Sequence, residues 1–381
     1  MSIANLYSNY QYQNIFGKYI THTQLYAALQ PYSQNICNIG YSVNNNPIHT
    51  YKFGNGKVKL LIWSQMHGNE PTTTKGLLDF IFYINSNEKN IKNILENFTL
   101  YIIPILNPDG AIAYTRENAN HIDINRDFYN KTQPETKFLL EVYNHYQPNF
   151  CFNLHDQRSI FSAGLLGKPA TLSFLAPSYN PERSYNTTRL NAVALINHLF
   201  NHLNKTLPHQ IGRFDDAFNI NCAGDYFTSL NTPTILVEAG HYPSDYDREI
   251  TRKYVFLTLF YALNFNYENV LVDSDLINYL NIPQNFKQYY DIIFKNVELF
   301  IDNSKIITNF ALQYKEQLIQ NKIVFTAFVE EIGELYDKIG HLEYNCEGNS
   351  IIYNSKNTIN IGDSANFCIG KNKYQNGILL K

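Results

Sequence analysis

Two short segments, far apart in the chain, together supply the side chains of a metal site. His67 and Glu70 follow an apolar run at residues 60–63, and His155 closes a second apolar run. Apolar runs of this length are typical of buried β-strands, so the three side chains are expected at strand ends. Two imidazole nitrogens and one carboxylate form the protein ligand set of a catalytic zinc ion, which keeps a fourth position open for water. The sequence therefore predicts one zinc ion per chain, held by His67, Glu70 and His155.

Two further carboxylates are candidates for the same site: Asp156 is next to one of the ligands, and Glu238 is at another strand end. Asp156 directly follows His155, and it is expected either to orient a ligand from outside the metal shell or to cap a helix or turn. Glu238 ends a short apolar strand and is followed by Ala239 and Gly240. A carboxylate in that position is poorly solvated, which raises its pKa and suits it to act as a general base. The alternative for Glu238 is a buried ion pair with an arginine.

Four further motifs lie between and after the metal-binding segments. In chain order they are NPDG at 107–110, REN at 116–118, DINRDF at 123–128 and LVEAG at 236–240. Together with the His-x-x-Glu pair and the second histidine, they resemble the zinc carboxypeptidases of the M14 family. The resemblance extends over roughly residues 45–265. The NPDG segment has the composition of a turn, and we expect it to be scaffold.

The resemblance implies roles for several residues. Arg116 matches the arginine that polarises the scissile carbonyl and stabilises its oxyanion, work that a fixed guanidinium does well. Asn125 and Arg126 match the pair that binds the terminal carboxylate of the substrate, for which Arg offers a bidentate fork. Glu238 matches the general base. The alternatives are a surface position for Arg116 and a structural ion pair for Arg126.

A tyrosine often assists carboxylate binding in this family, and two tyrosines here are candidates. Tyr226 and Tyr242 both lie near Glu238, and nothing in the sequence chooses between them; Tyr242 is our prediction for the substrate-binding one. The pocket for the last side chain of the substrate is expected among residues that precede Glu238, namely Arg213, Asp215, Asp216 and Asp225. An acidic group there would suit a basic C-terminal residue or an amino-bearing cell-wall residue.

Hydrophobic periodicity predicts an α/β fold. Strands are expected at residues 47–54, 57–66, 98–105, 149–154 and 234–237, and helices at 71–84, 134–146, 186–203 and 245–263. The dipeptide at 55–56, Asn-Gly, indicates a hairpin between the first two strands. Alternating strands and helices favour a mostly parallel mixed sheet covered by helices on both faces. Ligands bind such sheets at the carboxyl ends of the strands, where the predicted zinc ligands fall.

The chain is expected to have four parts. Residues 1–45 form an extension that packs on the main domain, 46–265 the zinc carboxypeptidase-like domain, 266–335 a helical region and 336–381 a small β-rich appendage. A partner-binding module is the alternative for the C-terminal parts.

Composition limits the class of protein. The 381 residues carry a net charge of −3, which argues against nucleic-acid binding. No stretch approaches the ~20 apolar residues that span a bilayer, and the N-terminus does not look like a signal peptide. The five scattered cysteines suggest neither disulfides nor a cysteine metal site. The expectation is a cytoplasmic protein without nucleic-acid or membrane partners, and the oligomeric state stays open.

Three functions are compatible with these residues. The leading one is a zinc metallocarboxypeptidase acting on a peptide with a free carboxylate. The second is an N-acyl amino acid deacylase, because the HGNE and VEAG segments also look like those of the aspartoacylase and succinylglutamate desuccinylase relatives. The third is a non-catalytic binding module, for which loss of a ligand or of the late Glu would be the sign. The NPDG segment favours the carboxypeptidase.

Overall fold

The computed structural model of this chain describes residues 7–268, 273–302 and 304–380. Internal contacts divide the chain into two compact units. The larger unit contains Met1–Gln157 and Ala170–Asn285, and the smaller unit contains Arg158–Pro169 and Phe286–Lys381. The segment that follows the predicted ligand His155 therefore belongs to a different unit from the ligand itself.

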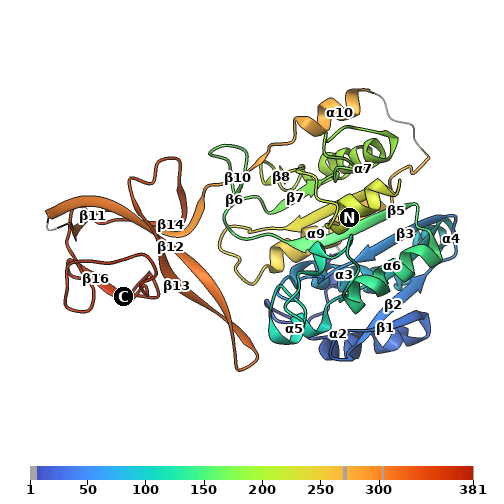
Figure 1. The fold of residues 1–381 in the computed structure, drawn as a ribbon, viewed down its shortest axis with the longest axis horizontal. Helices are drawn as coiled ribbons and strands as arrows, with labels where there is room; N and C mark the ends of the chain where they lie inside the picture. The colour runs from blue at the N-terminus through green and yellow to red at the C-terminus, as the bar shows by residue number, and fades with distance from the viewer. Residues whose placement is uncertain (1–6, 269–272, 303, 381) are drawn as a thin grey trace. The chain divides into compact units, whose positions relative to one another are not determined.

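The larger unit is built on one eight-stranded sheet (Figure 1). In spatial order its strands are β1 (Ile36–Tyr41), β2 (Pro47–Phe53), β4 (Phe98–Ile103), β3 (Val58–Trp63), β5 (Phe150–Asp156), β9 (Thr234–Ala239), β7 (Leu172–Leu175) and β8 (Ile211–Arg213). Strands β4, β3, β5 and β9 run parallel to one another, whereas β1, β2 and β7 join the sheet by antiparallel pairs. The predicted mixed α/β sheet is confirmed.

Helices cover both faces of this sheet. One apolar core packs α3 (Thr72–Ile84), α7 (Thr187–Leu203) and α9 (Glu249–Ala262) on one face, and a second core packs α6 (Pro134–Tyr146) and α8 (Ala223–Ser229) on the other. Strand β3 shows why: Leu60 and Ile62 belong to the first core, and Leu61 and Trp63 to the second. Side chains that alternate along a strand point to opposite faces, so an apolar run without polar interruption requires cover on both.

The remaining helices of the described residues are short. They are α2 (His22–Leu29), α4 (Ile91–Asn97), α5 (Pro108–Ala113) and α10 (Asp273–Leu280), with 3-10 turns η1 (Tyr7–Asn9), η2 (Gln30–Asn35) and η3 (Ile124–Arg126). Helix α5 begins inside the NPDG segment, which we predicted to be a simple turn. Asn107 caps it by accepting from Gly110 N at 2.8 Å, and Pro108 takes the first helical position, where its missing N–H costs nothing.

The predicted hairpin at Asn55 and Gly56 is wrong. Strands β2 and β3 both form, but β4 lies between them and pairs with each. The turn bonds to the approach to β4 instead: Asn55 N donates to Leu95 O and Gly56 N to Phe98 O. A Cβ on Gly56 would lie 1.9 Å from the carbonyl carbon of Asn97. Glycine is present because another backbone passes against it, which the dipeptide alone does not reveal.

The N-terminal segment is part of the larger unit and is joined to its helices by a buried polar network. Tyr7 Oη donates to Asp79 Oδ2 at 2.7 Å, and Arg252 Nη2 donates to Asp79 Oδ1 at 2.6 Å. Arg252 also donates to Tyr12 O and Ile15 O. These contacts join the segment before β1 to helices α3 and α9.

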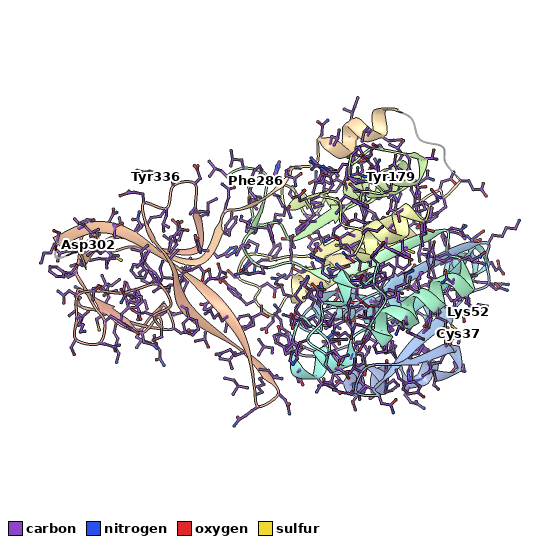
Figure 2. The ribbon with its side chains drawn as sticks, in the orientation of Figure 1. Cys37, Lys52, Tyr179, Phe286, Asp302 and Tyr336 are labelled. Atoms are coloured by element: carbon purple, nitrogen blue, oxygen red, sulfur yellow. The ribbon has the colours of Figure 1, made fainter. Side chains whose placement is uncertain are left out.

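The smaller unit is a β structure. Its strands are β6 (Phe161–Ala163), β10 (Asn285–Lys287), β11 (Tyr289–Ile301), β12 (Ser304–Ile319), β13 (Lys322–Gly333), β14 (Ile339–Asn345), β15 (Ile351–Ile352), β16 (Phe367–Ile369), β17 (Asn372–Gln375) and β18 (Ile378–Leu379). Two four-stranded sheets, β13-β12-β11-β14 and β15-β16-β17-β18, enclose an apolar core that includes Phe294, Phe310 and Phe367. Asp302 and Tyr336, labelled in Figure 2, flank β12 and β13 in the chain.

The predicted helical region at 266–335 is therefore wrong for most of its length. Among the described residues of this range only α10 is helical, and long strands follow it. Register shifts at Phe294/Val297 and at Ala311/Leu312 interrupt the alternation of apolar and polar residues that identifies a strand. In the described ranges, no helix combines the length and the apolar composition that crossing a bilayer requires.

Candidate active site

The three predicted metal ligands converge at the carboxyl ends of two adjacent parallel strands. His67 and Glu70 lie in the connection from β3 to α3, and His155 is the penultimate residue of β5. Glu70 Oε1 lies 2.8 Å from His67 Nδ1, and Glu70 Oε2 lies 2.8 Å from His155 Nδ1. The two Nδ1 atoms are 3.1 Å apart. Parallel pairing of β3 with β5, with Trp63 opposite Asn153, brings these segments together.

This arrangement fits a bound cation. One ligand atom from each of the three residues lies within 4.8 Å of the others. Two nitrogens bound to zinc at about 2.0–2.1 Å in tetrahedral geometry would be roughly 3.4 Å apart, close to the separation found here. The histidines hold the pKa of the buried Glu70 well below its usual range, against the effect of burial itself. The residues could hold a zinc ion without rearrangement of the strands.

The connection that carries His67 and Glu70 is fixed by its neighbours. Asn107 Nδ2 donates to Met66 O at 3.2 Å, and Gln65 Nε2 donates to Gly68 O at 2.8 Å. A Cβ on Gly68 would lie 1.9 Å from the carbonyl carbon of Gly110. The HGNE and NPDG segments therefore pack backbone against backbone at Gly68, which explains why the first segment needs glycine there and supports a scaffold role for the second.

Asp123 is a site residue whose role the sequence did not suggest. Its Oδ1 lies 2.9 Å from His67 Nε2, on the ring edge opposite the metal-facing nitrogen. A carboxylate there fixes the orientation of the imidazole and increases its basicity as a ligand. Burial opposes the charge, but His67 and Arg116 hold the pKa of Asp123 well below its usual range. The sequence feature that could have placed Asp123 in the site is its position two residues before the Asn125-Arg126 pair.

Arg116 contacts one of the predicted metal ligands and Asp123. Its Nε donates to Asp123 Oδ2 at 3.0 Å, and its Nη1 donates to Glu70 Oε1 at 3.3 Å. Its side chain is 46% exposed, so one side of the guanidinium remains open to solvent. A cation in that position can face a second negative charge at the centre.

Glu238 occupies the end of β9 directly beside His155, which is its register partner on β5. Its residue surface is 9% exposed, and its Oε2 has no hydrogen-bond partner among the described residues. Burial, the nearby Glu70 carboxylate and Asp156 raise the pKa of Glu238 well above its usual value. Among the described residues, no hydrogen-bonded ion pair joins Glu238 to a buried arginine, so the alternative that the sequence left open for Glu238 is not observed.

Asp156 serves both purposes that the sequence left open. Its carboxylate accepts from Thr72 N at 2.8 Å and from Thr73 N at 3.1 Å, and so caps α3. Its backbone N–H donates to Glu70 Oε2 at 3.1 Å. One residue thereby joins the end of β5 to the start of α3, and each of these elements adjoins a metal ligand.

Asn125 and Arg126 lie in η3, close to the start of α8. Asn125 Oδ1 accepts from Ala223 N at 2.8 Å, so this oxygen is already bonded. Arg126 Nη1 donates to Asn125 O at 2.7 Å and to Cys222 Sγ at 3.2 Å. Asp123 Oδ1 accepts from Asn125 N, which links this pair to the metal-binding residues.

The structure does not place the predicted tyrosine at the centre. Within the described residues, no recorded contact joins Tyr242 to the metal ligands, and Tyr226 packs against Phe128 and Phe227. The role of Tyr242 stays a prediction.

All four candidate pocket residues have structural partners. Asp216 pairs with the buried Arg189 at 2.6 Å, Asp215 accepts from Ala217 N, and Arg213 stacks over Tyr279. Asp225, in the first turn of α8, is buried, and burial raises its pKa to about 7. Its Oδ2 accepts from Asn219 N at 2.9 Å.

Comparisons with known proteins agree with this geometry. Residues 19–162 match the family model Peptidase_M14, zinc carboxypeptidase. Probable carboxypeptidase 2 of Arthroderma benhamiae is 30% identical over 108 residues, which are 28% of this chain and 20% of that protein. Carboxypeptidase SOL1 of Arabidopsis thaliana is 31% identical over 147 residues, covering 32% of this chain and 30% of that protein. The matches thus span less than a third of either relative's length.

Solved structures show the same fold. A metallo-carboxypeptidase from Burkholderia cenocepacia superposes with a TM-score of 0.51 at 15% identity, covering 65% of this chain and 69% of that chain. One from Pseudomonas aeruginosa, in complex with (2-guanidinoethylmercapto)succinic acid, gives 0.50 at 17% identity and covers 63% and 68%. The resemblance to the zinc carboxypeptidases of the M14 family is thereby confirmed, in sequence over residues 19–162 and in fold over 65% of the chain.

Proposed function

We propose that this protein is a zinc-dependent metallocarboxypeptidase that hydrolyses the C-terminal amide bond of a peptide. The observation that carries the proposal is the cluster of His67, Glu70 and His155 beside the buried carboxylate of Glu238, whose Oε2 has no hydrogen-bond partner among the described residues. A metal site with three protein ligands and an adjacent general base is the arrangement of a hydrolytic centre.

Each residue then has a defined part in amide hydrolysis. When bound, zinc would polarise the scissile carbonyl and increase the acidity of a water molecule. Glu238 accepts a proton from the attacking water and donates it to the leaving nitrogen, which returns the carboxylate to its starting state. Arg116 supplies positive charge for the oxyanion, and its contacts with Asp123 and Glu70 hold the guanidinium in place beforehand. Asp123 keeps His67 oriented.

Arg126, with Asn125, is proposed to bind the terminal carboxylate of the substrate. Arg126→Ala should therefore reduce hydrolysis of free-acid peptides far more than hydrolysis of the same peptides amidated at the C-terminus. A charge-assisted hydrogen bond is worth about 1.5–3 kcal/mol, so the expected loss in kcat/KM is about tenfold or more. Lys371→Ala, which removes an exposed cation of the smaller unit outside residues 158–169, is the control. Equal losses on both substrate forms would contradict the assignment.

The side-chain pocket is proposed to include Asp225. Among the described residues, Asp225 is the one acidic candidate that is buried and forms no ion pair with an arginine or a lysine. A buried carboxyl of this kind favours a substrate whose last residue carries an amino or guanidino group, including amino-bearing cell-wall peptides. Peptides ending in Lys or Arg should be cleaved faster than those ending in Leu, and Asp225→Asn should remove the preference.

An N-acyl amino acid deacylase is the competing function, since the same residues would act on an acyl amide with a free carboxylate. A panel of dipeptides and longer peptides compared with N-acyl amino acids separates the two. Faster turnover of N-acyl amino acids would overturn the peptidase proposal. Hydrolysis of any amide that stops on chelation and returns with zinc would exclude a non-catalytic binding module. One zinc per chain and a cytoplasmic location are part of the same proposal.

A further inference from the structure

The chain crosses between the two units at three points, and the first is next to the metal centre. It leaves the larger unit after Gln157, two residues beyond the ligand His155, and returns at Ala170. It leaves again after Asn285, and Phe286, labelled in Figure 2, is the first residue of the smaller unit's main segment. The metal-binding strand β5 is therefore continuous with a segment that folds with the smaller unit.

The side chain of Gln157 joins all three crossing points. Its Nε2 donates to Ala170 O at 2.8 Å and to Ser173 Oγ at 3.0 Å, and its Oε1 accepts from Asn285 Nδ2 at 3.0 Å. Gln157 is 5% exposed. Because a buried amide without partners is costly, these hydrogen bonds fix where the chain leaves and re-enters the larger unit.

The backbone of Gln157 is tied to the strand that carries Glu238. Gln157 N donates to Ala239 O at 2.9 Å, one step beyond the pairing of His155 with Glu238. Arg248, itself buried, donates to both Gln157 O and Ala239 O. A displacement of Gln157 would therefore also displace the ends of β5 and β9.

Gly240 makes room for this arrangement. A Cβ on Gly240 would lie 2.5 Å from Gln157 Nε2 and 1.9 Å from Ala170 O. The glycine at the end of the LVEAG segment is therefore required by the packing of the Gln157 side chain and the returning chain.

The segment 158–169 is itself held by hydrogen bonds inside the smaller unit. Gln288 Oε1 accepts from Ser162 Oγ at 3.0 Å and from Leu166 N at 2.7 Å. Gln288 N and Tyr289 N both donate to Ile160 O at 3.0 Å. The position of the segment is thus set by residues at the start of the smaller unit's main sheet.

We propose that Gln157 is a positioning residue that couples the metal centre to the smaller unit. The path runs from the Gln288 contacts through residues 158–169 to Gln157, and from Gln157 to Asp156 and His155. Asp156 binds Glu70 and caps α3, so the coupling reaches both metal-binding segments. The inference rests on the metal centre of the proposed function. It predicts that loosening residues 158–169 weakens metal binding, and that Gln157 is required for the effect.

A double-mutant cycle on the full chain tests this, with zinc affinity of the apo-protein measured by competition with a chromophoric chelator. Gln288→Ala should weaken zinc binding about tenfold, the lower end of what loss of outer support costs a metal site. Asn376→Ala is the matched control, because its side chain holds Ala327 N and Phe325 O within the smaller unit and has no recorded contact with residues 158–169. It should change zinc affinity by less than about twofold.

In the Gln157→Ala background, Gln288→Ala should have almost no further effect. If Gln157→Ala does not fold, Asn285→Ala removes one arm of the same hydrogen-bond group and takes its place. Melting temperatures recorded on each preparation separate affinity from stability. Effects of Gln157→Ala and Gln288→Ala that multiply, or a Gln288→Ala protein with lowered melting temperature and wild-type zinc affinity, would overturn the coupling while leaving the proposed function intact. A wild-type protein that binds no zinc would overturn both.

Discussion

Glu238→Gln should lower turnover by about 10²–10⁴, the usual contribution of a positioned general base. Glutamine has nearly the same shape, and Glu238 is not among the three proposed metal ligands. Zinc content should therefore be unchanged. The rate of the wild-type enzyme should fall on the acidic side, because a Glu238 carboxyl whose pKa is raised takes up its proton at a higher pH and then cannot accept one from water. The variant should lack this acidic limb.

The stability of the same variant has a predicted sign. The pKa of Glu238 is raised in the folded protein, so the unfolded chain loses this proton at a lower pH than the folded protein does. The free energy of unfolding therefore falls as the pH rises from the pKa of Glu238 in the unfolded chain to its pKa in the folded protein. A neutral glutamine amide avoids that loss. Glu238→Gln should melt at the same temperature as wild type or higher at neutral pH. Full zinc, unchanged melting and near-normal turnover would refute the catalytic role.

His155→Ala should abolish stoichiometric zinc binding, and His67→Ala should do the same. Each change removes one of the three proposed protein ligands and leaves the others without the geometry of the site. The loss of affinity should exceed the roughly 10–100-fold that loss of an outer-shell partner costs. Elemental analysis after dialysis measures this directly.

A histidine away from the centre provides the control for these two variants. His198→Ala, on α7, removes a half-buried imidazole that bonds Tyr261 O. It should retain one zinc per chain. Unchanged zinc in both His67→Ala and His155→Ala would mean that the metal, if present, is held elsewhere.

The parts of the fold that the sequence predicted are those governed by local patterns. Helices α3, α6 and α7 have clear apolar stripes and recognisable first residues, and their bounds were close to those observed. The position of β4 between β2 and β3 is a non-local pairing, so the Asn-Gly signal at 55–56 was misleading. The strands of the smaller unit were missed because bulges break their alternation of apolar and polar residues. Their β-branched residues, such as Ile292, Ile293 and Val297, favour strands and were the evidence available in the sequence.

The same distinction applies to the site. His67, Glu70 and His155 were predictable because two strand ends with ligand-type residues must meet at one edge of a parallel sheet. Asp123 was not, because its contact with His67 depends on how the loop after α5 returns to the centre. Gln157 gave no signal at all, since its importance comes from three chain crossings that no local pattern encodes. The sequence does not distinguish Tyr242 from Tyr226, and within the described residues no contact joins Tyr242 to His67, Glu70 or His155.

The most direct test of the account is mass spectrometry of a peptide incubated with the zinc-loaded protein, in its free-acid form and in its C-terminally amidated form. We expect stepwise loss of single residues from the C-terminus of the free acid, little change in the amide, and no reaction after chelation until zinc is restored. Internal cleavage, equal hydrolysis of both forms, or unchanged activity in the chelated protein would contradict it.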